Sequence, residues 1–276
     1  MKFIITIIIA VILGAVGYVA YTKNYLQYEK QTNKPKKQYI NTQYFMNDAD
    51  RALYAELREN NPADMILESG REYLSQIGGD KAFAKFLNVS TKNLPHYIAG
   101  FPRYIQKFNM VVGLDQAIQA FIYKKKAQKL TLGSSKMFAL LTYVKSIANG
   151  EKININVKKD VALYESYLLG QKTFHQERGK RGLSCLSCHS QDITGSVLRT
   201  QPLPDLSAKG VAPAASWPAY RMTKSSLRTL QRRFQGCMKN SLMTVIPLGS
   251  PEMVGLEVYL TKKAKGAEIA IPGIKR

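Results

Sequence analysis

The sequence is poor in acidic residues. It contains 19 Asp and Glu against 40 Lys and Arg, which gives a formal net charge of +21 and a pI near 9.8. Such an excess would attract acidic proteins, small anions, lipid head groups or nucleic acid, although a lysine-rich solvated surface without a partner is the plainer alternative. We do not expect nucleic acid as a partner, because the N-terminus is typical of an exported protein.

The sequence also lacks strong runs of alternating apolar and polar residues, which argues against a β fold. Its apolar residues recur instead at three- and four-residue spacing, so we predict a mainly α-helical protein with room for two domains in 276 residues. The predicted helical stretches are 49–60, 62–77, 113–130, 134–150, 159–174, 225–240 and 250–266.

The N-terminus lacks charge after Lys2, in a run from Phe3 to Thr22. This run is long for a signal peptide and just long enough to cross a bilayer, so residues 1–22 are predicted to be a signal peptide or a membrane anchor through residues 3–21. Residues 23–45 are predicted to be a basic linker. Their lysines favour the cytoplasm by the positive-inside rule, but the chemistry of the cysteine motif described below requires export, so we expect a periplasmic protein.

An internal repeat appears at a shift of 116 residues, with about a dozen identities in about fifty positions. Matched pairs include Leu114 with Leu230, and residues 132–134 match 248–250. A repeat of this size predicts two tandem domains, which we place at residues 46–155 and 156–276. The first copy has Phe121 where the second has Cys237, and its equivalent of the segment before residue 190 has neither cysteine nor histidine. We therefore expect a degenerate first domain, which keeps the scaffold but, if the cysteine motif of the second copy described next holds haem, binds none.

Only three cysteines are present, and two of them stand in the stretch CLSCH as Cys185 and Cys188, followed by His189. Cys-x-x-Cys-His is the attachment signature of c-type haem. Two thiols on one helical turn form thioethers with the porphyrin, and the adjacent imidazole ligates the iron. A thioredoxin-like pair lacks its βαβ context here. A zinc site made of Cys185, Cys188, Cys237 and His175 stays open as an alternative.

A distal haem ligand other than histidine is needed, because no histidine follows His189. The candidates are Cys237 and four methionines, at positions 222, 238, 243 and 253. Arg233 precedes Cys237 by one helical turn, so the two side chains share a face. A guanidinium there would lower the pKa of the thiol and bind a small tetrahedral oxyanion; a buried inert cysteine is the competing interpretation. His96 and His175 are interpreted as structural residues.

Four segments together give a specific resemblance. They are SCLSCHSQDITGSVLR, WPAYR, LQRRFQGC and EMVGLEVYLTKKAKGAEIAIPGIKR. From about Met46 to Arg276 the chain resembles the SoxA family, the cytochrome subunits of a bacterial thiosulfate-oxidising system. Members have two cytochrome c domains and many bind two haems, whereas the single CxxCH here implies one covalent haem c.

The resemblance implies an enzyme that joins thiosulfate oxidatively to a cysteine of the carrier SoxYZ, an L-cysteine S-thiosulfotransferase. It implies SoxX as partner subunit and a c-type cytochrome as electron acceptor. Carried over by position, Cys185 and Cys188 hold the haem, His189 and Cys237 ligate the iron, Cys237 carries the sulfur, and Arg233 binds the anion. The alternatives are an electron-transfer cytochrome without sulfur transfer and a thiosulfate dehydrogenase-like enzyme.

Overall fold

The computed structural model describes residues 48–126, 129–193, 196–198, 201–207 and 212–275, all within one compact unit, Ile40–Arg276. The predicted signal peptide or anchor and the whole of the predicted basic linker, residues 1–45, lie outside these residues. Within the described ranges, no helix has both the length and the apolar character that crossing a bilayer requires.

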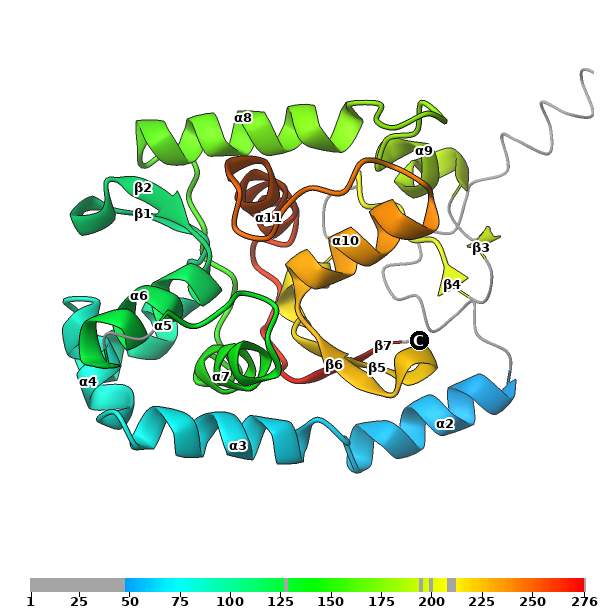
Figure 1. Cartoon of the computed structure of the whole chain (residues 1–276). Helices are drawn as coiled ribbons and strands as arrows, with labels where there is room; N and C mark the ends of the chain where they lie inside the picture. Colours follow the sequence, from blue (N-terminus) through cyan, green and yellow to red (C-terminus); the bar gives the residue numbers. More distant parts are fainter. Residues whose placement is uncertain (1–47, 127–128, 194–195, 199–200, 208–211, 276) are drawn as a thin grey trace, which may run out of the picture. The chain divides into compact units, whose positions relative to one another are not determined.

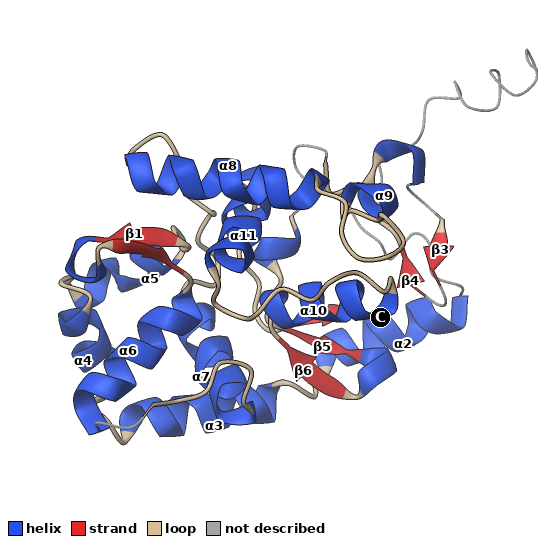
Figure 2. Ribbon diagram, turned by 45° about the horizontal axis from the view of Figure 1, so that its top comes forward, coloured by secondary structure: helices blue, strands red, loops and turns tan. Residues whose placement is uncertain are grey.

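Helices make up most of the described structure (Figure 2), which confirms the predicted mainly α class. The α-helices are α2 (Asp48–Glu59), α3 (Asp64–Ser75), α4 (Gly79–Phe86), α5 (Leu94–Ile98), α6 (Leu114–Lys126), α7 (Ser135–Ser146), α8 (Val161–His175), α9 (Leu186–His189), α10 (Leu230–Asn240) and α11 (Pro251–Lys263). Short 3-10 turns are η2 (Thr91–Asn93), η3 (Gln106–Phe108), η4 (Gln191–Ile193), η5 (Pro213–Ala215) and η6 (Met222–Lys224).

The strands are only two or three residues long. They are β1 (Arg103–Ile105), β2 (Met110–Val112), β3 (Val197–Leu198), β4 (Gln201–Pro202), β5 (Ala219–Arg221), β6 (Ser226–Arg228) and β7 (Gly273–Lys275). They form two two-stranded hairpins, β1–β2 and β3–β4, and one three-stranded sheet in the order β6-β5-β7. In that sheet β5 runs antiparallel to β6 and parallel to β7. Strands this short carry no detectable alternation, which is why sequence patterns did not predict them.

One predicted helix is too long at its start. The stretch 225–240 forms α10 only from Leu230 onward. Ser225 adopts a left-handed conformation with φ of 44°, and Ser226–Arg228 pair with β5. Thr229 then caps the helix by accepting from the backbone N–H of Arg232. The first residues of the predicted helix, 225–229, therefore belong to the β5–β6 hairpin and the helix cap instead.

The 116-residue repeat recurs as backbone structure. The order strand, 3-10 turn, strand, helix occurs as β1–η3–β2–α6 and again as β5–η6–β6–α10. Asn109 and Ser225, which are 116 residues apart, both adopt the left-handed conformation after the 3-10 turn, with φ of 49° and 44°. Ser134 and Ser250, also 116 apart, both cap the next helix, accepting from the N–H of Met137 and of a second methionine, Met253.

A close helix crossing also occurs in each half, where α3 lies beside α7 and α8 beside α11 (Figure 1). A Cβ atom on Gly70 would stand 2.1 Å from the carbonyl oxygen of Ala139, and one on Gly170 would stand 1.8 Å from that of Gly255. Ala139 and Gly255 are again 116 apart, but Gly70 and Gly170 are 100 apart. The second half therefore has 16 additional residues between this crossing and its hairpin, in the segment that includes CxxCH.

The two halves share one hydrophobic core. Ile153, Ile155 and Val157, at the expected domain boundary, are buried in a cluster that draws residues from both halves. The Gly150 N–H donates to the carbonyl of Ile269 at 3.0 Å, so the backbone also joins the halves. The boundary at residues 155 and 156 stays a prediction. A second cluster lies wholly in the second half and forms part of the pocket described next.

Candidate active site

Helix α9 places the CxxCH residues on one turn. The N–H of Cys188 donates to the carbonyl of Cys185 at 3.2 Å, and the N–H of His189 donates to the same carbonyl at 3.0 Å. Ser184 and Ser187 hold the turn reciprocally, each side-chain oxygen accepting from the other residue's backbone N–H at 3.2 and 3.1 Å. The thiols of all three cysteines are free of disulfides.

The imidazole of His189 is oriented for metal binding. Its Nδ1 lies 2.9 Å from the carbonyl oxygen of Pro204. Because a carbonyl oxygen only accepts, Nδ1 carries the proton and the lone pair is left on Nε2. Such a contact fixes both the tautomer and the ring plane of a ligating histidine. The backbone N–H of Leu206 donates to the His189 carbonyl at 3.0 Å, which anchors the same loop to α9.

A pocket of about 800 Å³, measured to its open mouth, connects α9 to α10. Its polar and sulfur-bearing lining includes Cys185, Cys188, His189, Arg233 and Cys237. The rest of the lining is mainly apolar: Phe174, Leu203, Leu206, Phe234, Met238, Met243, Leu256 and Leu260. A flat apolar macrocycle with two thioether bonds and an iron at its centre fits this donor set and this wall, so the residues present fit haem c.

Helix α10 is held in a fixed rotation by buried amide contacts. The side chain of Gln231 is buried, donating from Nε2 to Glu257 Oε2 at 2.8 Å and accepting the backbone N–H of Gly249 at 2.9 Å. Arg233 and Cys237 then follow at a spacing of four residues and both line the pocket. The predicted shared face is therefore present in the structure.

The three thiols differ in acidity. Burial raises the pKa of Cys237, but the positive charges around it, chiefly that of Arg233 and also that of Arg221, outweigh burial and bring the pKa to about 7. Burial, together with the nearby Cys237, raises the pKa of Cys185 to about 12, and the same two causes raise the pKa of Cys188. At neutral pH the surroundings thus favour a thiolate only at Cys237, the form that acts as nucleophile and metal ligand.

The four methionines considered as distal ligands differ in whether they reach the pocket. Met238 and Met243 line the pocket, whereas Met222 and Met253 are absent from its lining. The sulfur of Met238 accepts the backbone N–H of Ile246 at 3.5 Å. Cys237 stays the predicted distal ligand because it combines pocket position with thiolate character.

Two further cations lie close to this site and were not predicted from the sequence. Arg221, at the end of β5, is buried, and its neighbour across the parallel ladder is Lys275 of β7. Burial and the charge of Arg233 lower the pKa of Arg221 to about 10, and burial and the charge of Arg221 lower the pKa of Lys275 to about 8. Both residues belong to segments that the sequence analysis had singled out, Arg221 to WPAYR and Lys275 to GIKR. The sequence could not show that they are close together, because their proximity depends on strand pairing.

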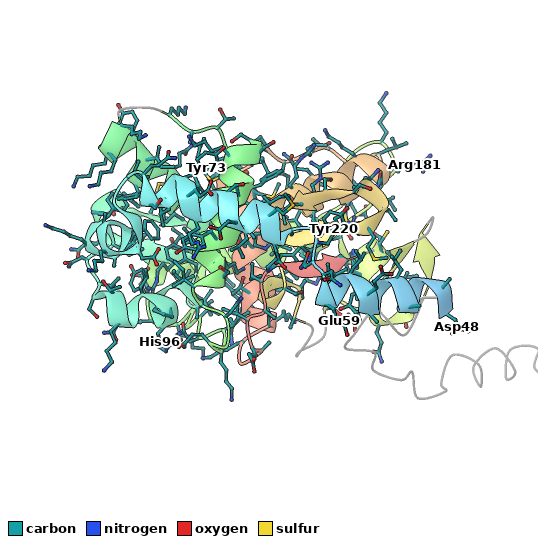
Figure 3. All side chains as sticks on the ribbon, turned by 90° about the horizontal axis from the view of Figure 1, so that it is seen from below. Asp48, Glu59, Tyr73, His96, Arg181 and Tyr220 are labelled. Carbon is teal, nitrogen blue, oxygen red and sulfur yellow. The ribbon has the colours of Figure 1, made fainter. Side chains whose placement is uncertain are left out.

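The remaining histidines lie apart from the pocket lining. The ring of His96 is 71% exposed and lies 3.3 Å from Glu151; Figure 3 shows it well separated from Arg181, which is four residues before Cys185. His175 is exposed at the end of α8, with Nδ1 2.8 Å from its own helix. Among the described residues no three His, Cys, Asp or Glu side chains gather as a metal-ligand set, so the four-ligand zinc alternative finds no support.

Comparison with known proteins gives a consistent set of relatives. Residues 169–269 match the model of the SoxA/TsdA cytochrome c domain. An L-cysteine S-thiosulfotransferase subunit SoxA from Hydrogenophilus thermoluteolus is 27% identical over 240 residues, covering 80% of this chain and 85% of the relative. A SoxA subunit from Hydrogenobacter thermophilus is 28% identical over 221 residues, covering 77% and 83%. The crystal structure of SoxXA from P. pantotrophus matches with a TM-score of 0.69 at 19% identity, covering 86% of both chains.

Fold, pocket and family match define the class of the second half. Residues 169–269 match the SoxA/TsdA cytochrome c domain, and a domain of this kind binds haem c covalently, as CxxCH predicted. Within that class, the relatives that match most of the chain are SoxA subunits. The resemblance to SoxA that the sequence indicated is therefore confirmed.

Proposed function

We propose that this chain joins thiosulfate oxidatively to a cysteine of a carrier protein, with the Cys237 thiolate as the reacting group. One observation carries the proposal: Cys237 stands in the wall of the CxxCH pocket, one helical turn from Arg233, whose positive charge favours the thiolate and which lines the same pocket. An electron-transfer cytochrome needs no such thiolate. The names of the relatives, L-cysteine S-thiosulfotransferase subunit SoxA, point to the same reaction.

Each site residue has a distinct role in this proposal. Cys185 and Cys188 form the two thioethers, and His189 and Cys237 are the axial ligands. Arg233 holds the substrate anion beside Cys237, since a guanidinium fork matches a tetrahedral oxyanion. When bound, haem c supplies a one-electron acceptor next to the reacting sulfur.

The overall reaction balances with two electrons leaving. Thiosulfate and a carrier thiol, R–SH, give R–S–S–SO₃⁻, one proton and two electrons, and a new S–S bond forms. Cys237 first takes up the thiosulfate sulfur and then passes it to the carrier thiol. The low pKa keeps Cys237 as thiolate for the first step and makes it a good leaving group in the second.

The partners follow from the same chemistry. The structural relative is a SoxXA protein, which supports SoxX as a partner subunit, and we infer SoxYZ as the carrier and a c-type cytochrome as the electron acceptor. The periplasm is the compartment in which these partners would meet. The net charge of +21 would accelerate encounters with thiosulfate and with an acidic carrier.

The test is Cys237→Ala in the haem-loaded protein. We expect haem content, measured by the pyridine haemochrome, to stay at the wild-type value, the optical and EPR spectra of the iron to change, and conjugation of thiosulfate to the carrier cysteine to be lost. Ser241→Ala is the matched control, because Ser241 lines the same pocket and has no proposed role.

Two other outcomes would contradict the proposal. Full conjugation activity with an unchanged spectrum would leave Cys237 as an inert pocket residue. A shifted reduction potential with reduction, reoxidation and conjugation intact would indicate an electron carrier whose ligand happens to be a thiolate.

A further inference from the structure

Helix α10, which carries Cys237, ends in a C-terminal cap of the Schellman type. The backbone N–H of Met243 donates to the carbonyl of Met238 at 2.8 Å, and the N–H of Leu242 donates to that of Lys239 at 3.2 Å. Met238 and Met243 are buried in the same apolar cluster, which is the contact that usually accompanies this cap. The backbone and the buried methionine pair therefore fix the end of the helix.

Leu242 occupies the position of this cap that has a left-handed backbone, with φ of 56°. Glycine normally stands there, because a β-carbon is unfavourable in this conformation. In the part of the chain that the structure describes, the other non-glycine residues with positive φ are the small polar residues Asn88, Asn109 and Ser225. A leucine at this position therefore costs stability that a glycine would not.

The side chain of Leu242 contributes little to the core. It is 59% exposed, and it is absent from the three apolar clusters of the described residues. A single exposed leucine is ordinary on a protein surface, but this one is also held in an unfavourable backbone conformation. Because strained positions of this kind concentrate at functional sites, we look for the use of Leu242 in a contact with another molecule.

Leu242 lies at the rim of the pocket that contains Cys237. The residues before and after it, Ser241 and Met243, both line this pocket. Asn240 also lines the pocket and is exposed to solvent, so pocket and solvent meet on this segment. A protein that brings a thiol to Cys237 across this part of the rim would touch Leu242.

A turn of the chain lies against the same segment. The N–H of Arg178 donates to the carbonyl of Leu183 at 2.9 Å, which closes a hairpin around residues 179–182. A Cβ atom on Gly179 would stand 2.6 Å from the carbonyl oxygen of Leu242. The backbone of the turn therefore touches the backbone of Leu242, and the tip of the turn belongs to the same rim.

The surroundings of Leu242 are positively charged. Lys180 and Arg181, at the tip of the turn, are exposed, and Figure 3 shows Arg181 at the periphery of the molecule. Lys239, in the last turn of α10, is exposed as well, and Glu177 is the acidic residue of the hairpin. An apolar side chain among cations is complementary to an apolar contact with an acidic rim, because the apolar centre supplies affinity and the charges accelerate the encounter.

We propose that Leu242 and the cations around it are the docking surface for the carrier protein, with Leu242 entering an apolar contact on an acidic carrier surface beside the reactive cysteine. The inference rests on the proposed function, since it names where the second substrate of that reaction binds. The reaction needs a protein thiol to reach Cys237 and to leave again. A permanently bound subunit on this rim would obstruct that entry, which favours the transient carrier as the occupant.

Leu242→Gly separates docking from folding, because glycine suits the left-handed backbone. We expect the urea midpoint of the haem-loaded chain to stay at the wild-type value or rise. The affinity for the carrier should fall roughly five- to thirtyfold, because burial of an exposed leucine side chain is lost. Isothermal titration calorimetry measures this affinity on the haem-loaded protein with its SoxX subunit, with SoxYZ whose reactive cysteine is replaced by serine as the titrant.

Steady-state conjugation with the intact carrier gives a second measurement. In Leu242→Gly the KM for the carrier should rise in proportion to the loss of affinity, whereas the KM for thiosulfate should stay unchanged. Leu242→Asn, which also tolerates the left-handed backbone, should give the same pattern. The double variant Lys180→Gln with Arg181→Gln should slow association and reduce its dependence on salt, with dissociation nearly unchanged.

Leu53→Ala is the matched control, because Leu53 is an exposed leucine of α2, 43% exposed, in the first half of the chain. It should leave the affinity and the KM for the carrier at wild-type values. An equal loss of affinity in Leu53→Ala would show that exposed leucines contribute without regard to place, and the docking surface would then be wrong.

Four other results would overturn the docking surface. They are an unchanged carrier affinity in Leu242→Gly, a lower urea midpoint in that variant, a weakened affinity for SoxX with the carrier affinity intact, and a wild-type dimer of this chain that Leu242→Gly dissociates. Failure of the proposed function is distinct, because the titrant lacks the reactive thiol. Conjugation that persists in Cys237→Ala would refute sulfur transfer through Cys237 and leave the binding measurement as it stands.

Discussion

Helices α6 and α10 occupy equivalent places in the two halves but have opposite chemistry. At a shift of 116 residues, Phe121 corresponds to Cys237, and Ala117 to Arg233. Phe121 is fully buried, with its ring 5.4 Å from Phe83 and 5.3 Å from the Phe86 ring. Cys237 instead lines a pocket. On α6 this position is filled by the buried ring of Phe121, whereas on α10 the corresponding position faces a pocket that fits a prosthetic group.

The comparison extends to the helices that face them. In the first half α4 contributes Phe83 and Phe86 against Phe121. In the second half α9 contributes the histidine of CxxCH, and His189 and Cys237 line the same pocket. One scaffold therefore supports either an aromatic core or a haem pocket, and the two halves differ in side chains on these helices and in the 16 additional residues of the segment that includes CxxCH.

The largest difference expected between the halves is in haem content. The matured protein should carry one covalent haem c per chain, because CxxCH occurs once and Phe121 fills the corresponding space in the first half. The pyridine haemochrome, set against protein concentration from amino-acid analysis, measures the ratio. A ratio near two would remove the distinction between the halves.

Phe121→Ala should destabilise the protein by about 3–5 kcal/mol, because it opens a cavity in a close-packed core. Urea unfolding followed by circular dichroism measures the change, and at temperatures where the variant is folded the haem spectrum should be that of the wild type. A change below about 1 kcal/mol would contradict the interpretation that the ring substitutes for a prosthetic group as core.

Arg233→Ala should weaken the use of thiosulfate by about 1.5–3 kcal/mol, which is roughly ten- to a hundredfold in kcat/KM, through loss of a charged contact to the anion. The haem spectrum should change little. Arg232→Ala is the control, since Arg232 bonds to Gln235 at 3.0 Å on the same helix and does not line the pocket. Wild-type turnover at low thiosulfate in Arg233→Ala would show that Arg233 does not bind the substrate anion.

Asp115 and Gln231 are also equivalent, one an acid and the other an amide. Burial and the charge of Glu257 raise the pKa of Asp115 to about 7 from 3.8. A raised pKa stabilises the fold while the carboxyl is protonated, so this stability is present below pH 4 and is lost as pH rises toward 7. Relative to wild type, Asp115→Asn should therefore gain up to about 4 kcal/mol of stability between pH 4 and pH 7, because each tenfold change in proton affinity is worth about 1.4 kcal/mol. Urea midpoints at the two pH values measure it, and an opposite trend would refute the argument.

Gly236→Ala should give the smallest effect. The equivalent residue of the first half is Ala120, and a Cβ at Gly236 would meet no atom within 4 Å. Helix propensity alone then predicts a gain of about 0.5–1 kcal/mol in stability. Conjugation measured on the same variant sharpens the comparison: a loss of activity despite the gain would show that a partner or substrate approaches the backbone beside Cys237.

Local spacing made part of the site predictable from the sequence. Cys185, Cys188 and His189 are consecutive on one turn, and Arg233 and Cys237 are one turn apart, so each relation depends only on helix geometry. The duplication was visible because its shift is constant over fifty residues. The predicted start of helix α10 was too far toward the N-terminus. The left-handed backbone of Ser225 and the pairing of β6 prevent a helix there, although the spacing of apolar residues suggested one.

Long-range pairing made the rest unpredictable. Lys275 reaches Arg221 only because β7 joins a sheet of three-residue strands, and no pattern in either strand announces the partner. The carbonyl of Pro204 that fixes the His189 tautomer likewise comes from a loop without a recognisable motif. Sequence signals identified which residues carry the chemistry, while their supporting contacts depend on the folded chain.

The crossing of α8 and α11 at Gly170 and Gly255 has a consequence for electron transfer. These two helices contribute Phe174, Leu256 and Leu260 to the pocket wall, and their backbones touch where no side chain would fit. Walls packed this closely would have little freedom to shift on reduction or oxidation of a haem bound between them. The reorganisation energy of each electron step should accordingly be small, so the two electrons of the reaction can leave one after the other without the cavity changing shape.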